Sequence, residues 1–109
     1  MNMMDLQKQS QKAAELLKMM SNEKRLQILC HLGECELSVN ELVDIIGLSQ
    51  SALSQHLAVL RAQNLVSTRR QAQMIFYSIK DNAVNEILKT LYQLYCPKQS
   101  NSNNRSPLL

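Results

Sequence analysis

The chain has 109 residues and a formal net charge of +3; 45% of its residues are hydrophobic and only 4% are aromatic. This length predicts one domain with a modest core, for which oligomerisation is a common way to bury more surface. Two glycines and two prolines argue against a turn-rich β-sandwich, and the few aromatic residues argue against a stacking platform for single-stranded nucleic acid.

The N-terminal part of the chain predicts two helices. Met1–Leu6 lacks the basic patch and apolar stretch of a secretory signal, and no apolar run approaches the roughly 18 residues of a transmembrane helix. We therefore expect a cytoplasmic protein with no membrane segment. Residues 5–20 have helical periodicity, and Asn22 is suited to cap a second helix, Glu23 to about Leu32, which Gly33 would end.

Two further helices are predicted on either side of a tight turn. Ser38–Glu41 has the pattern of a capping box, which opens a short helix that ends at Ile46. Gly47 lies where a left-handed residue should terminate that helix. Ser49 can then cap a fourth helix, which continues to about Gln63. The inward-facing positions of this helix are Leu53, Leu57 and Leu60.

A β-hairpin is predicted to follow the fourth helix. Leu65–Arg70 and Met74–Ile79 are rich in Val, Thr, Ile, Phe and Tyr, and residues 71–73 would form the tip. Asp81 or Asn82 then caps a last helix that runs to about Cys96.

The last helix carries an apolar stripe, and its simplest use is self-dimerisation. The stripe has near-heptad spacing and consists of Val84, Leu88, Leu91 and Tyr95. Pro97 stops the helix, and the Ser/Asn/Lys/Gln-rich tail is predicted to be disordered. The expected organisation is therefore one domain, residues 1–96, and a disordered tail, residues 97–109.

The charge distribution indicates a polyanionic partner. No Asp or Glu occurs between Ile45 and Lys80, whereas four basic residues do, namely Arg61, Arg69, Arg70 and Lys80. A short capped helix, a glycine turn and a second capped helix form a helix-turn-helix, and the basic hairpin forms a wing. The alternatives are chance clustering of charge and an ordinary surface helix.

The predicted fold is therefore mainly α with a two-stranded β-wing, a homodimeric winged helix-turn-helix in the order α-α-α-α-β-β-α. The fourth helix would enter the major groove and the wing would reach phosphates or an adjacent minor groove. His56 could instead pack against the wing. The predicted contacts to double-stranded DNA are Gln50, Ser51, Ser54, Gln55, His56, Arg69 and Arg70.

Residues 13–96 resemble the ArsR/SmtB family of dimeric bacterial repressors. The matching stretches are residues 21–29, 37–42, 48–57 and 65–66, of which Leu-Ser-Gln-Ser…Ser-Gln-His-Leu is the most specific. The family's metal box reads Glu-Leu-Cys-Val-Cys-Asp-Leu, and Ser38 and Asn40 stand here where the thiolates would be. A hydroxyl and a neutral amide are poor ligands for soft metals, so no metal site is predicted.

Three cysteines, at positions 30, 35 and 96, lack Cys-x-x-Cys spacing and are expected to be thiols. The segments around Cys30 and Cys96 resemble the thiol- and persulfide-sensing BigR/SqrR/HlyU-like branch of the family. The resemblance implies that these two cysteines lie near each other and are oxidised to a disulfide or bridged by polysulfide. On the residues alone, inert buried thiols are the alternative. Cys35 either takes no part in this reaction or competes with Cys96 for Cys30.

These features predict a dimeric repressor, formed through its first and last helices, that releases operator DNA when reactive sulfur or an oxidant links Cys30 to Cys96. Alternatives are a winged-helix regulator that responds to a metal ion or general oxidants, and a protein-interaction module without DNA binding. An enzyme is not expected, because no catalytic constellation or phosphate-binding glycine loop is present. No cofactor is predicted.

Overall fold

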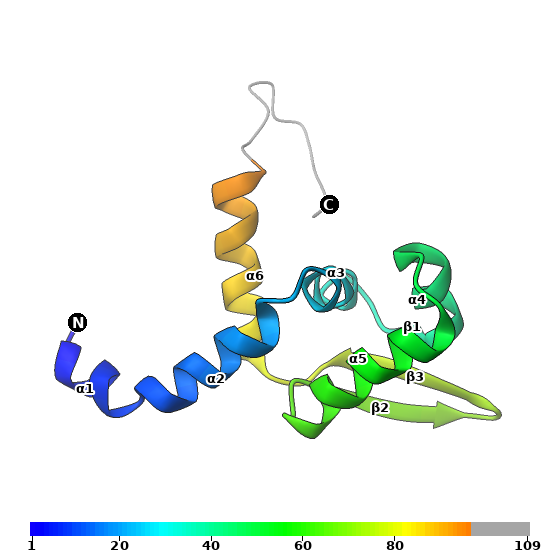
Figure 1. Cartoon of the computed structure of the whole chain (residues 1–109), viewed down its shortest axis with the longest axis horizontal. Helices are drawn as coiled ribbons and strands as arrows, with labels where there is room; N and C mark the ends of the chain where they lie inside the picture. The colour runs from blue at the N-terminus through cyan, green and yellow to red at the C-terminus, as the bar shows by residue number, and fades with distance from the viewer. Residues whose placement is uncertain (97–109) are drawn as a thin grey trace.

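The computed structural model describes residues 1–96 (Figure 1). Within this range no helix is long and apolar enough to cross a membrane. The elements in chain order are α1 (Met3–Lys8), α2 (Ser10–Met20), α3 (Glu23–Leu32), β1 (Leu37–Ser38), α4 (Val39–Ile46), α5 (Gln50–Ala62), β2 (Val66–Gln71), β3 (Met74–Ile79) and α6 (Asn82–Tyr95). The predicted mainly helical fold with a β-wing is confirmed.

The first helix differs from its prediction, because residues 5–20 belong to two helices that are separated at Gln9. The Asn2 side chain caps α1 by accepting from the Met4 N–H, but α1 has no buried residue. The apolar periodicity therefore does not correspond to burial in α1, whereas Leu16, Met19 and Met20 of α2 pack on the core. In Figure 1, α1 and α2 form an arm that projects from the body on the side away from the wing.

The predicted helix caps of the central region are confirmed. Asn22 Oδ1 accepts from the Arg25 N–H, and Ser38 and Glu41 form both hydrogen bonds of the capping box. Gly47 is left-handed, with φ 85°, as the turn after α4 requires. Gly33 also ends its helix, as predicted, and it stays right-handed, with φ −66°.

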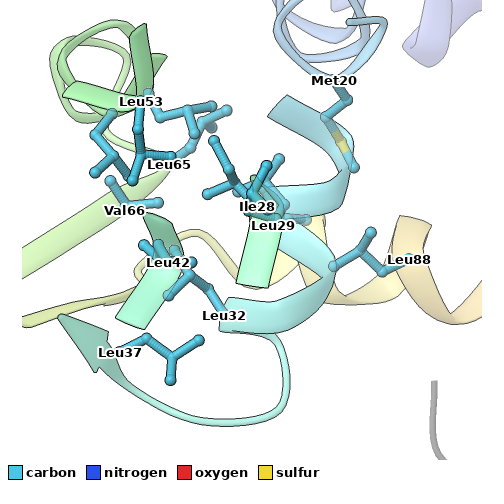
Figure 2. Close-up of a cluster of buried hydrophobic side chains, with 14 residues drawn as sticks. Met20, Ile28, Leu29, Leu32, Leu37, Leu42, Leu53, Leu65, Val66 and Leu88 are labelled. Atoms are coloured by element: carbon cyan, nitrogen blue, oxygen red, sulfur yellow. The ribbon is translucent and has the colours of Figure 1, made fainter. Parts of the chain in front are cut away.

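The core lies where α3, α4 and α5 meet the base of the sheet (Figure 2). These helices contribute most of it because their leucines and isoleucines recur at helical spacing. The fully buried side chains are Ile28, Leu29, Leu42, Leu53, Leu57, Leu60, Val66 and Val84. The three inward-facing leucines predicted for the fourth helix are therefore confirmed.

The sheet has three strands, in the order β1-β3-β2, rather than the two of the predicted wing. The short strand β1 pairs antiparallel with β3, with Leu37 opposite Tyr77 and Ser38 opposite Phe76. Two residues are too few to show a period-two pattern, so the sequence carried no signal for β1. Ser38 is both the end of β1 and the N-cap of α4, so the sheet is joined directly to the helix-turn-helix.

Asp81 caps the last helix by accepting from the Ala83 N–H, and Cys96 is the C-cap. Val84 and Leu88, predicted to belong to a dimerisation stripe, are instead buried in the core of their own chain. The C-terminal end of α6 remains exposed, with Leu94 at 67% and Tyr95 at 77% of full exposure. The predicted disordered tail, residues 97–109, lies outside the described residues.

Candidate nucleic-acid interface and thiol pocket

Helix α5 presents a polar face to solvent, and its leucines anchor the opposite face in the core. The Ser49 Oγ accepts from the Ala52 N–H at 3.2 Å, which fixes the start of the helix. The side chains of the first turns that point outward carry hydroxyl and amide groups and no negative charge. On α5, the exposed residues among those predicted to contact DNA are Gln50, Ser51, Ser54 and Gln55.

His56 is half-buried on α5 and lies near Arg25 of α3. Burial, followed by the positive charge of Arg25, lowers the pKa of His56. The imidazole is therefore neutral at pH 7 and can act as a hydrogen-bonding group rather than as a cation. Arg25 itself is held in place, because its Nε donates to the Met19 carbonyl at 2.7 Å across the α2–α3 turn.

The two arginines of the wing are in different situations. Arg69 forms a bidentate ion pair with Glu36, with a closest N···O distance of 2.8 Å. The Arg70 side chain is exposed and makes no hydrogen bond or ion pair to any residue in the described range. Glu36 precedes Arg69 by 33 positions, so no local pattern in the sequence pairs the two residues.

Cys30 and Cys96 line the same cavity, which lies between α3 and α6 and has a volume of about 250 Å³. Cys30 lies in the last turns of α3, and the Cys96 N–H donates to the Tyr92 carbonyl at 2.8 Å. The other lining residues are aliphatic or aromatic, namely Leu26, Leu88, Leu91, Tyr92 and Tyr95. The sequence did not indicate that these residues line a cavity, because they do not differ from ordinary core residues.

Burial, followed by the proximity of Cys96, raises the pKa of Cys30. Cys30 is therefore almost entirely a thiol near neutral pH, and its reaction as a thiolate becomes faster as pH rises. Both cysteines of the cavity are half-buried, whereas Cys35 is exposed in the turn after α3 and does not line the cavity. All three are free thiols in this structure.

The region that corresponds to the family's metal box has a structural use here. The Ser38 Oγ accepts from the Glu41 N–H at 3.2 Å, and the Glu41 carboxylate accepts from the Ser38 N–H at 2.8 Å. The Ser38 side chain is thus engaged as a helix cap. Asn40 is exposed in the first turn of α4. Among residues 1–96 no three His, Cys, Asp or Glu side chains are grouped so that they could hold a metal ion.

A helix-turn-helix with a polar, acid-free recognition helix and an adjoining wing defines a winged-helix DNA-binding regulator. Residues 22–68 match the family model "Bacterial regulatory protein, arsR family". The chain is 53% identical to the "Transcriptional activator HlyU" of Vibrio cholerae serotype O1, over 88% of this chain and 89% of that protein. The chain belongs to the ArsR family of transcriptional regulators, and it is not an enzyme.

Solved structures of related proteins share the fold. "Reduced HlyU from Vibrio cholerae N16961" superimposes with a TM-score of 0.80 and 53% identity, covering 84% of this chain and 97% of that one. The transcriptional repressor BigR from Xylella fastidiosa gives a TM-score of 0.85 at 39% identity, covering 90% of this chain and all of that one (100%). The predicted resemblance to the BigR/HlyU-like branch is confirmed.

Proposed function

We propose that this ArsR-family regulator is a homodimeric repressor that releases operator DNA when Cys30 and Cys96 become linked by reactive sulfur species. The observation that carries the proposal is that these two thiols, 66 positions apart in the sequence, line one cavity between α3 and α6. Two structurally similar proteins are described as a reduced form and as a repressor, respectively.

The proposed DNA contacts are those of the recognition helix and wing. Gln50, Ser51, Ser54 and Gln55 would read base edges in the major groove, and His56, neutral at pH 7, would donate or accept one hydrogen bond. Arg70 would contact a phosphate. Arg69 was predicted to do the same, but its guanidinium is paired with the Glu36 carboxylate.

The proposed dimer uses the arm and the end of the last helix. Leu6 on α1, Leu17 on α2 and Leu94 and Tyr95 on α6 are exposed apolar side chains. Large exposed hydrophobic residues on adjoining helices are typical of a protein–protein interface. A second copy of the chain would cover them.

The proposed chemistry converts two thiols into one covalent link. With a low-molecular-weight persulfide RSSH, one cysteine thiolate attacks the sulfane sulfur and releases RSH, which leaves a cysteine persulfide. The second cysteine attacks the inner sulfur of that persulfide and releases H₂S, so that two thiols and RSSH give a disulfide, RSH and H₂S. When both cysteines are first persulfidated, their condensation releases H₂S and leaves a trisulfide.

The link would change the position of α6 relative to α3. Because α6 is part of the proposed dimer interface and α3 packs against the recognition helix, a shift between them alters the spacing of the two recognition helices in the dimer. DNA half-sites lie about one helical turn, roughly 34 Å, apart, so a changed spacing loses base and phosphate contacts together.

The test is DNA release by a persulfide donor in matched cysteine variants. A labelled duplex, enriched with the reduced wild-type chain from a randomised pool, is titrated with protein before and after treatment. We expect the wild type and Cys35→Ser to lose affinity at least tenfold, and Cys30→Ser and Cys96→Ser to keep it. Loss of DNA by treated Cys96→Ser, or release by zinc alone, would contradict the proposal. Repression itself is read from a promoter that carries the selected duplex.

A further inference from the structure

The ion pair between Arg69 and Glu36 connects parts of the fold that are distant in sequence. Arg69 lies on β2, and its Nε and Nη2 donate to both carboxylate oxygens of Glu36 at 2.8–3.0 Å. Its Nη1 donates to Gln71 Oε1 at 2.8 Å, and the guanidinium lies 4.8 Å from the centre of the Phe76 ring. Four hydrogen bonds and a ring contact therefore hold one side chain in one orientation.

The register of the sheet explains why these groups meet. Arg69 is paired with Phe76, and Phe76 is paired with Ser38, so the three residues form one row across β2, β3 and β1. Glu36 precedes Ser38 by two positions and is placed on the same face of the sheet by the period of an extended chain. The Arg69 side chain thus extends from β2 across the central strand β3 to the opposite edge of the sheet, where β1 lies.

The partner segment belongs to the helix-turn-helix. Glu36 is followed directly by β1, which consists of only two residues, and Ser38 caps α4. The base of the wing packs on the core, and beyond that packing the wing is joined to the helix-turn-helix by the two residue pairs between β1 and β3 and by the Arg69–Glu36 ion pair. An ion pair with 51% and 33% exposed side chains contributes little to overall stability, but a bidentate one fixes an orientation.

We propose that Arg69 is a positioning residue, which holds the wing at a fixed orientation to the recognition helix by binding Glu36, and that Arg70 supplies the phosphate contact of the wing. The Arg69 charge is matched by a carboxylate, whereas Arg70 has no partner among residues 1–96. The proposal rests on the DNA binding of the family and is independent of the thiol switch.

The test compares the salt dependence of DNA binding in charge-matched variants. Each phosphate contact contributes about 0.9 to the slope of log affinity against log salt concentration. The double variant Glu36→Gln/Arg69→Gln removes one charge of each sign, so the net charge is unchanged. We expect its slope to equal that of the wild type, with affinity for the selected duplex lowered roughly two- to fivefold at every salt concentration. Arg70→Gln should reduce the slope by about 0.9 per bound protomer.

A second measurement does not require DNA. Amide hydrogen exchange of residues 69–76 should be faster in Arg69→Gln and in the double variant than in the wild type, and unchanged in Arg70→Gln. A double variant whose slope falls by about 0.9 per protomer would show that Arg69 binds a phosphate and would overturn the proposal. Unchanged affinity together with unchanged exchange would also overturn it. Absence of DNA binding in the wild type would instead count against the regulator function.

Discussion

The region from α3 to β3 and the region made of α1, α2 and α6 differ in how much of their apolar surface is buried within a single chain. The first region buries most of its apolar side chains within the chain and contains most of the core. In the second, α1 buries nothing, α2 buries only Met20, and the end of α6 leaves Leu94 and Tyr95 exposed. The region from α3 to β3 thus forms its core without a partner, and we call it the self-sufficient region. The helices α1, α2 and α6 leave apolar surface exposed that a partner could cover, and we call them the incomplete region.

The thiol pair lies where the two regions meet. Cys30 belongs to α3, which is central to the self-sufficient region, and Cys96 ends α6, which belongs to the other. A covalent link between them would couple the packing of the DNA-binding region to the surface proposed for dimerisation.

The largest effect on stability is expected from a substitution that creates a cavity in the self-sufficient region. Leu57 is 1% exposed on α5, so Leu57→Ala should lower the free energy of unfolding by about 2–5 kcal/mol in urea denaturation. Val59 on the same helix is 38% exposed, and Val59→Ala should change stability by less than about 0.5 kcal/mol. Equal losses in the two variants would contradict the assignment of the core.

A charge on the incomplete region should separate protomers without unfolding them. We expect Leu94→Glu to weaken dimerisation at least tenfold, or about 1.4 kcal/mol, in sedimentation equilibrium. Gln93→Glu adds the same charge at the neighbouring exposed position and serves as the control. If Leu94→Glu dimerises as tightly as the control, the end of α6 is not in the interface.

Loss of the cap at the start of the helix-turn-helix should have a smaller effect. The buried Ser38 side chain accepts from the Glu41 N–H, so Ser38→Ala should cost about 1 kcal/mol of unfolding free energy. Ser38→Asp keeps an acceptor at the cap and should recover part of that loss, although it brings a second carboxylate close to Glu41. Equal stability of Ser38→Ala and the wild type would show that the capping box does not stabilise α4.

The smallest expected effect is a pH dependence that comes from Cys30. Because burial raises the pKa of Cys30 in the folded chain, the unfolded chain loses this proton first as pH rises. The unfolding free energy of the reduced protein should therefore fall as pH rises from the ordinary cysteine range through the folded pKa of Cys30, and be unaffected below that range. Cys30→Ser should lack this component, and identical pH profiles of the two proteins would contradict the prediction.

The sequence was most informative where structure is local. The caps at Asn22, Ser38 and Ser49 and the left-handed Gly47 follow from residue types a few positions apart, and all four were predicted correctly. The outward position of the polar residues of α5 followed from the spacing of its leucines.

Features that depend on contacts distant in sequence were not predicted. Strand β1 is too short to have a pattern and exists because β3 pairs with it. The break at Gln9 occurs in a stretch whose side chains are exposed, and Val84 and Leu88 were assigned to an interface because periodicity cannot distinguish core from surface. The Arg69–Glu36 ion pair depends on the register of the sheet. The proximity of Cys30 and Cys96 was implied by family resemblance and not by spacing.

The most direct test of the thiol switch is intact-mass spectrometry with peptide mapping of the reduced protein after a persulfide donor and, separately, after peroxide. We expect a link within one chain between the peptides that contain Cys30 and Cys96, as a disulfide or, when both cysteines are persulfidated first, as a trisulfide with one additional sulfur atom after the donor. Cys35→Ser should form the same link. No link with either reagent, or a link that always includes Cys35, would contradict the account and leave the two thiols of the cavity as packing residues.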